Sequence, residues 1–278
     1  MVYNIKKGGT DMLYNAKNGT ACFEGGTLDY IRFGTGRKKL LMLPGLGDGL
    51  RTVKGTALPM AAMYRMFAKD FTVWAFSRRN DQKPGATTRD MARDAALAMD
   101  ALGMERAAVL GVSMGGMIAQ WLAIDYPEKV EKLILAVTSP APNPILTESV
   151  EEWMALAKQG DHAGFMDSNL RRIYSDGYYR KNRWLAPLVG RLTRPKSYDR
   201  FFVLADACMT HDAHAYLCRI QAPALVIGGE QDQCLGGEAS RQLAAAIPGA
   251  KLKMYPQWGH GVYEEEKEFN SLVLDFLK

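Results

Sequence analysis

The sequence predicts an α/β protein, with a mostly parallel sheet, helices on both faces and a helical lid insertion. Short apolar runs typical of buried strands alternate with segments of helical periodicity along most of the chain. Between residues 141 and 215 the helical patterns continue, but no convincing strand pattern occurs. The composition, 47% hydrophobic and 23% charged in 278 residues, is typical of a globular chain with a sizeable core.

Four strands are expected in the first part of the chain. They are Thr20–Phe23, Leu28–Phe33, Lys39–Leu43 and Phe71–Phe76. Glu24-Gly25-Gly26 separates the first two and indicates a hairpin. The third strand ends in a glycine-rich loop, Pro44 to Gly49. The fourth is continuously apolar, as expected of a strand buried on both faces.

Further along, a threonine cap at Thr87 followed by an acid at Asp90 predicts a helix that stops at Gly103. Strands and helices then continue to alternate. The remaining strands are expected at Ala107–Leu110, Lys132–Val137, Ala224–Ile227 and Ala250–Met254, and the closing helix at Lys267–Leu277. Within the insertion, helices are expected around Thr147–Gln159 and Ala163–Ile173. This order is typical of a parallel sheet covered on both faces.

The chain is interpreted as one α/β core in two parts, residues 1–140 and 216–278, interrupted by the lid at 141–215. The longest apolar stretches are far too short to span a bilayer. Met1–Lys7 has lysines with no apolar region behind them, so no export signal is expected. We therefore expect a cytoplasmic protein without a membrane span.

The charge distribution disfavours a nucleic-acid-binding protein, and the cysteine spacing disfavours a zinc protein. The net charge of +5 is spread along the chain, so nucleic-acid binding is not expected. The four cysteines, Cys22, Cys208, Cys218 and Cys234, form no CxxC pair, which argues against zinc and fits a reducing compartment. A Cys208–Cys218 bridge stays an open alternative to free thiols.

One short motif carries the chemistry. Gly111-Val112-Ser113-Met114-Gly115 stands between an expected strand and a helical pattern. Glycines on each side permit a bend too sharp for residues with a Cβ, so Ser113 would project from the apex at a helix N-terminus. A nucleophile gains there from the helix dipole. The alternative is a tight turn that happens to contain serine.

Because of this glycine-flanked serine turn, residues 111–115, here called the elbow, the sequence resembles the α/β-hydrolase superfamily. The resemblance covers nearly the whole chain from Leu28 and is strongest over residues 99–136, 222–232 and 255–277. The elbow segment is similar to those of lactonases and esterases of the 3-oxoadipate enol-lactonase type. The resemblance implies a serine hydrolase that needs no cofactor and no metal.

A serine needs a base, and this fold orders its residues serine, acid, histidine along the chain. His260, between glycines after the last strand, fits that order, whereas His162, His211 and His214 do not. The resemblance places the acid at Asp232, with Glu230 as the alternative. His211 and His214 could be imagined as metal ligands together with Asp212, but no further ligand cluster lies nearby in the sequence, so helix-surface or core-edge positions are the favoured interpretation.

Acyl transfer also needs donors for an oxyanion. The backbone N–H of Met114, after the nucleophile, is expected to be one donor. The resemblance places the second at Leu46, although many relatives carry histidine where this chain has Pro44. After the fourth strand, "FSRRNDQKPG" keeps only Arg78 of the family's usual pattern.

The predicted activity is hydrolysis of a small-molecule carboxylic ester or lactone through Ser113, His260 and Asp232. Acyl transfer, carbon–carbon bond hydrolysis and a receptor without activity are the alternatives. Lid residues could attract an anionic substrate or could form a solvated face; the basic ones are Arg171, Arg172, Arg180, Lys181, Arg183, Arg191, Arg194 and Arg200. Methionines could line an acyl pocket or fill the core; these are Met60, Met63, Met66, Met114, Met154 and Met166.

Overall fold

The computed structural model describes residues 14–185, 190–191 and 193–278. The segment Met1–Lys7, from which no export signal was expected, lies outside the described residues. The strands form one sheet in the order β1-β2-β4-β3-β5-β6-β7-β8. Their bounds are β1 (Lys17–Phe23), β2 (Gly26–Phe33), β3 (Lys38–Leu43), β4 (Phe71–Arg79), β5 (Ala107–Val112), β6 (Val130–Ala136), β7 (Ala224–Gly229) and β8 (Lys251–Tyr255).

The sheet is mostly parallel, as predicted. Strand β2 is antiparallel to both of its neighbours, and the pairs from β4 through β8 are all parallel. The turn between β1 and β2 is the expected hairpin, with Phe23 opposite Gly26. Strand β4 is buried along almost its full length, as its continuous apolar run indicated.

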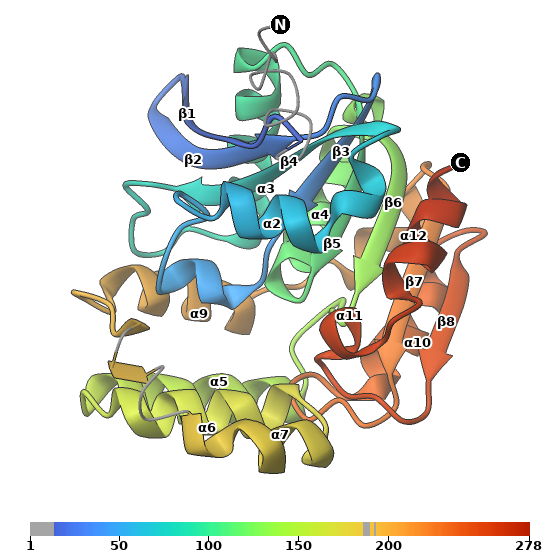
Figure 1. The fold of residues 1–278 in the computed structure, drawn as a ribbon. Coiled ribbons are helices and arrows are strands. Elements are labelled where there is room, and N and C mark those ends of the chain that lie inside the picture. The colour runs from blue at the N-terminus through green and yellow to red at the C-terminus, as the bar shows by residue number, and fades with distance from the viewer. Residues whose placement is uncertain (1–13, 186–189, 192) are drawn as a thin grey trace, which may run out of the picture.

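Helices cover both faces of the sheet (Figure 1). Their bounds are α2 (Ala57–Met63), α3 (Thr88–Ala101), α4 (Met114–Asp125), α5 (Pro144–Lys158), α6 (His162–Ile173), α7 (Asp176–Asn182), α9 (Asp199–Met209), α10 (Gly237–Ala246), α11 (Val262–Glu265) and α12 (Phe269–Leu277). Because alternate residues of a strand face opposite sides, β3 contributes to two cores. Leu41 and Leu43 share one with α3, α4 and α10. Leu40 and Met42 share the other with α2 and α12.

Local signals explain where two helices begin. At α3, Thr87 Oγ1 accepts from the backbone N of Asp90 at 3.1 Å, and Asp90 Oδ2 accepts from the backbone N of Thr87 at 3.0 Å. This capping box confirms the expected start. Helix α5 begins three residues before the expected Thr147, because Asn143 Oδ1 caps the backbone N of Leu146 at 3.0 Å and a proline follows that cap.

Between β6 and β7 the described residues form helices α5, α6, α7 and α9 and no strand. Figure 1 shows α5, α6 and α7 grouped at one end of the molecule, with α9 between them and the sheet. We call residues 141–215 the inserted segment. Within the described ranges, every helix is too short or too polar to cross a bilayer.

Candidate active site

The glycine-flanked serine occupies a strained turn. Strand β5 ends at Val112 and α4 begins at Met114, so Ser113 alone makes the junction. Its backbone has φ 55° and ψ −124°, a conformation that residues with a side chain rarely adopt. The backbone N of Ser113 donates to Ala136 O on β6 at 2.9 Å, which fixes the turn against the neighbouring strand.

Close backbone approaches explain the glycines of the elbow. A Cβ on Gly111 would lie 2.5 Å from Gly115 O, and a Cβ on Gly115 would lie 1.8 Å from Leu43 O. Larger residues at either position would push the first turn of α4 away from β5 or from the end of β3. The glycines therefore allow the helix start, the serine and the loop after β3 to meet.

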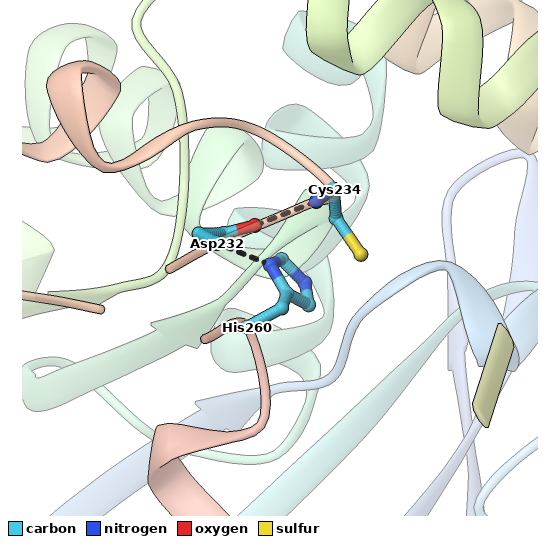
Figure 2. A group of neighbouring side chains, drawn as sticks. All are labelled: Asp232, Cys234 and His260. Carbon is cyan, nitrogen blue, oxygen red and sulfur yellow. Dashed lines mark hydrogen bonds and ion pairs between the residues drawn. The ribbon is translucent and has the colours of Figure 1, made fainter. Parts of the chain in front are cut away.

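The predicted acid and base are paired. His260 Nδ1 lies 2.8 Å from Asp232 Oδ2, and both side chains are buried (Figure 2). The other oxygen, Asp232 Oδ1, accepts the backbone N–H groups of Cys234 at 2.8 Å and Leu235 at 2.9 Å. Three hydrogen bonds thus hold the carboxylate in place.

The pair forms because two adjacent loops are tied together. Asp232 follows β7 and His260 follows β8, which are neighbouring parallel strands. The backbone N of Gln231 donates to Trp258 O at 3.1 Å. A Cβ on Gly229 would lie 2.4 Å from Trp258 O, so only glycine lets the loops pass this closely.

Asp232, Cys234 and His260 also resemble a metal-ligand set, since one donor atom from each lies within 4.8 Å of the others. The hydrogen bonds described above already use both carboxylate oxygens of Asp232. Burial, with Asp232 adding to it, raises the pKa of the Cys234 thiol well above its usual value. Because a protonated thiol is a poor metal ligand, this geometry suits an acid–histidine pair better than a metal site.

Ser113 and His260 line the same cavity, which has a volume of about 380 Å³. Its walls come from the loop after β3, the elbow and the inserted segment. Most of the lining is apolar, and Trp153, Phe165 and Phe201 contribute aromatic rings. The cavity lies where β3, β5 and β8 reach their carboxyl ends, the usual ligand-binding edge of a parallel sheet.

The two expected oxyanion donors lie at helix starts. Leu46 begins the 3-10 helix η1 (Leu46–Gly49), and Met114 begins α4, so neither amide N–H has an acceptor within its own helix. A Cβ on Gly45 would lie 3.3 Å from Ser113 Cβ and 3.7 Å from Ser113 Oγ. The loop after β3 therefore passes directly beside the serine. Leu46 also lines the cavity.

Two arginines support the loop after β3. The buried Arg78 donates a guanidinium N–H to Pro44 O. Asp48 Oδ2 accepts from the Arg78 backbone N at 2.9 Å and from Arg200 Nη2 at 2.7 Å, and Arg200 Nε donates to Asp48 O at 3.0 Å. Arg200, which the sequence places among the other basic residues of the lid, thus contacts the loop after β3, a contact that its sequence position does not indicate.

The inserted segment touches each loop that carries a candidate residue. Arg200 on α9 binds the loop after β3, as above. Ser149 Oγ on α5 donates to Gln233 O, beside the predicted acid, at 3.0 Å. The backbone N of Gly261, next to His260, donates to Ile173 O at the end of α6 at 2.6 Å. These contacts fix the three loops relative to one another through a single helical unit.

The alternative residues lie elsewhere. Glu230 pairs with Arg241, so the acid bonded to His260 is Asp232 rather than Glu230. His211 is buried in the core, with Nδ1 2.8 Å from Thr88 Oγ1, and burial lowers its pKa to about 4. In the described ranges, His211, His214 and Asp212 do not gather as a metal-ligand cluster.

The basic lid residues and the methionines, which the sequence offered as residues that attract an anionic substrate or line an acyl pocket, contribute little to the cavity lining. None of the described basic residues of the inserted segment lines the cavity. Arg171 and Arg172 pair with Glu152, and Arg172 also pairs with Glu148. Of the six methionines, Met60 alone lines the cavity, whereas Met63 and Met66 are 54% and 44% exposed.

Comparisons with known proteins agree with this architecture. A hydrolase of Pseudomonas putida, named for 2-hydroxy-6-oxononadienedioate and 2-hydroxy-6-oxononatrienedioate, is 28% identical over 265 residues, which cover 90% of this chain and 91% of that protein. A hydrolase of Burkholderia vietnamiensis with the same named substrates is 29% identical over 290 residues, covering 97% and 99%. The crystal structure of the enol-lactonase from Burkholderia xenovorans LB400 superposes with a TM-score of 0.79 at 23% identity, covering 93% and 99%.

The comparison with protein families agrees with these relatives. The sequence pattern described as the alpha/beta hydrolase fold matches residues 39–267, which include the serine elbow and the acid–histidine pair. The activity that these relatives support is that of a hydrolase. The chain therefore belongs to the α/β-hydrolase fold family.

Proposed function

We propose that this chain is a serine hydrolase that cleaves a carboxylic ester or a lactone. The observation that carries the proposal is the shared cavity, which is lined both by a serine held at positive φ and by a histidine bonded to a buried carboxylate. The largely apolar lining suits the carbon skeleton of such a substrate, and the inserted segment would act as the lid over it.

Each group has a defined step in the proposed reaction. His260 takes the proton of Ser113 as its oxygen attacks the carbonyl carbon, and Asp232 holds the Nδ1–H tautomer and stabilises the imidazolium. The backbone N–H groups of Leu46 and Met114 donate to the oxyanion. His260 then gives its proton to the leaving alkoxide. Water, activated by the same histidine, releases the acid and restores Ser113.

Replacing the nucleophile tests the proposal. Ser113→Ala should reduce the turnover of short-chain nitrophenyl esters by several orders of magnitude, because no alcohol remains to form the acyl-enzyme. Ser197→Ala, an exposed position away from the cavity, is the matched control and should retain full turnover. Undiminished turnover by folded Ser113→Ala protein would overturn the assignment.

A second candidate is hydrolysis of a carbon–carbon bond beside a ketone. The observation that favours it is the name of the two relatives, whose substrates are oxo acids rather than esters. The same serine, histidine and acid would be used. Parallel assays of nitrophenyl esters, lactones and a vinylogous diketone acid separate the two candidates. Added alcohol or thiol acceptors would reveal acyl transfer, and a receptor would turn over none of these compounds.

A further inference from the structure

The cavity has an apolar lining with few charges. Among the described residues, the carboxylate and guanidinium side chains that belong to its lining are those of Asp48 and Arg51. The Asp48 side chain is fully buried and forms an ion pair with Arg200. Arg51, in contrast, is exposed. Arg51 is thus the exposed cationic residue at the rim of the cavity, and its Nη2 lies 3.6 Å from where a Cβ on Gly55 would stand, just outside the lining.

No described carboxylate neutralises Arg51. The acidic side chain that contacts this segment is Asp29, which accepts from Thr52 Oγ1 at 3.0 Å. Asp29 instead forms an ion pair with Lys54 at 3.7 Å and also accepts from Thr20 Oγ1. In the part of the chain that the structure describes, the guanidinium of Arg51 has no hydrogen-bond or ion-pair partner.

The position of Arg51 is set by the loop that carries the candidate oxyanion donor. Its backbone N donates to Gly47 O at 3.3 Å, so Arg51 closes the turn that begins at Leu46. Arg78 and Arg200 also donate to this loop, and Asp48 is the one carboxylate that they share. Arg78 and Arg200 are held by carbonyl oxygens and by Asp48, whereas Arg51 adds a cation that no described carboxylate pairs, and such a cation favours anionic ligands.

We propose that Arg51 binds a carboxylate of the substrate, so that the preferred substrates are esters or lactones carrying a second, free carboxylate group. This rests on the proposed function. A guanidinium presents two parallel N–H donors that match a carboxylate, and its stem can lie along apolar walls. The selectivity for anions that the sequence suggested for the lid is thereby assigned to Arg51 on the loop after β3.

The test compares two substrates that differ only in charge. Monoethyl esters of C4 to C8 diacids are paired with the same esters in which the free carboxylate is a primary amide. The kcat/KM ratio of acid to amide is measured for wild type, Arg51→Gln, Arg51→Lys and Arg51→Glu. Lys54→Gln removes an exposed positive charge three residues away, outside the cavity lining, and serves as the control.

For at least one chain length, Arg51→Gln should lower the acid-to-amide ratio about tenfold, mainly through KM, because one charge-assisted contact is lost. Arg51→Lys should keep part of the ratio, Arg51→Glu should invert it, and Lys54→Gln should leave it unchanged. An equal ratio in wild type and Arg51→Gln at every chain length would overturn the proposal.

A binding measurement gives a readout apart from turnover. Calorimetry with the matching diacids should show binding to Ser113→Ala protein and weaker binding to the Ser113→Ala/Arg51→Gln double variant. Hydrolysis of the amide esters that depends on Ser113, with no effect of Arg51, would refute the role of Arg51 and leave the proposed function standing. Diacid binding that depends on Arg51, without hydrolysis of any ester, would refute the ester activity and support the anion site.

Discussion

His260 Nδ1 lies 2.8 Å from Asp232 Oδ2, and the opposite oxygen of the same carboxylate accepts two backbone N–H groups. The carboxylate is therefore held from both sides before any substrate enters. An imidazole bonded in this way is fixed in one tautomer, which leaves Nε2 as the nitrogen that can accept a proton.

Removing the charge of Asp232 should disable the histidine without removing it. We expect Asp232→Asn to lower kcat for ester hydrolysis by about 10⁴-fold, because an amide N–H directed at Nδ1 would favour the wrong tautomer. Steady-state kinetics checks this, with circular dichroism to show that the variant is folded. Glu230→Gln, two residues earlier and paired with Arg241, should keep normal kcat. Equal activity losses in the two variants would contradict the assigned role of Asp232.

The contact between α9 and the loop after β3 predicts a coupled effect on stability and activity. Arg200→Met would leave the buried Asp48 carboxylate without its ion-pair partner. Such a loss destabilises a fold by about 3 kcal/mol. We also expect a lower kcat, since the loop that carries Leu46 loses its hydrogen bonds to Arg200.

The double variant Arg200→Met/Asp48→Asn separates these two effects. Removing the unpaired charge should recover part of the free energy of unfolding, measured with denaturant, while kcat should stay low because Arg200 no longer holds the loop. Wild-type kcat in folded Arg200→Met protein would show that Arg200 has no part in positioning the loop.

Burial of His211 predicts a pH effect on stability. Its folded pKa is lowered to about 4, below the ordinary value of 6.5, so the unfolded chain binds the proton more readily between these values. The free energy of unfolding is therefore not reduced by His211 above about pH 6.5, and it falls by about 3 kcal/mol as the pH falls toward 4. Unfolding free energies measured across this range should therefore fall less steeply in His211→Gln than in wild type.

The control for that experiment is His214→Gln. His214 is exposed, so its loss should leave the pH dependence of wild type unchanged. If His211→Gln retained the full slope between pH 6.5 and 4, other groups would account for the acid sensitivity.

Much of the site could be predicted from the sequence because its signals are local. Ser113 lies between glycines at a strand–helix junction, and His260 follows a recognisable strand, whereas the choice of Asp232 over Glu230 came from the family resemblance. Several helices lack such a local signal. Among them, α2 has no side-chain cap at Thr56, and α10 begins after Gly236, which has no side chain to form a cap.

The support of the loop after β3 could not be predicted for a different reason. Asp48 and Arg200 are 152 residues apart, and Arg200 is one of many basic residues in the inserted segment. Nothing local distinguishes it from Arg172, whose charge is matched by Glu148 and Glu152 on the neighbouring helix α5. Whether an arginine stays free to bind a ligand depends on which acidic side chains the fold places beside it.

The central claim, that His260 activates Ser113 as a nucleophile, is tested most directly by covalent labelling. Folded protein is treated with a fluorophosphonate and the modified peptide is identified by mass spectrometry. We expect a single adduct on Ser113, no adduct in Ser113→Ala, and much slower labelling in His260→Gln. An adduct on another residue, or folded wild-type protein that stays unlabelled, would contradict the claim.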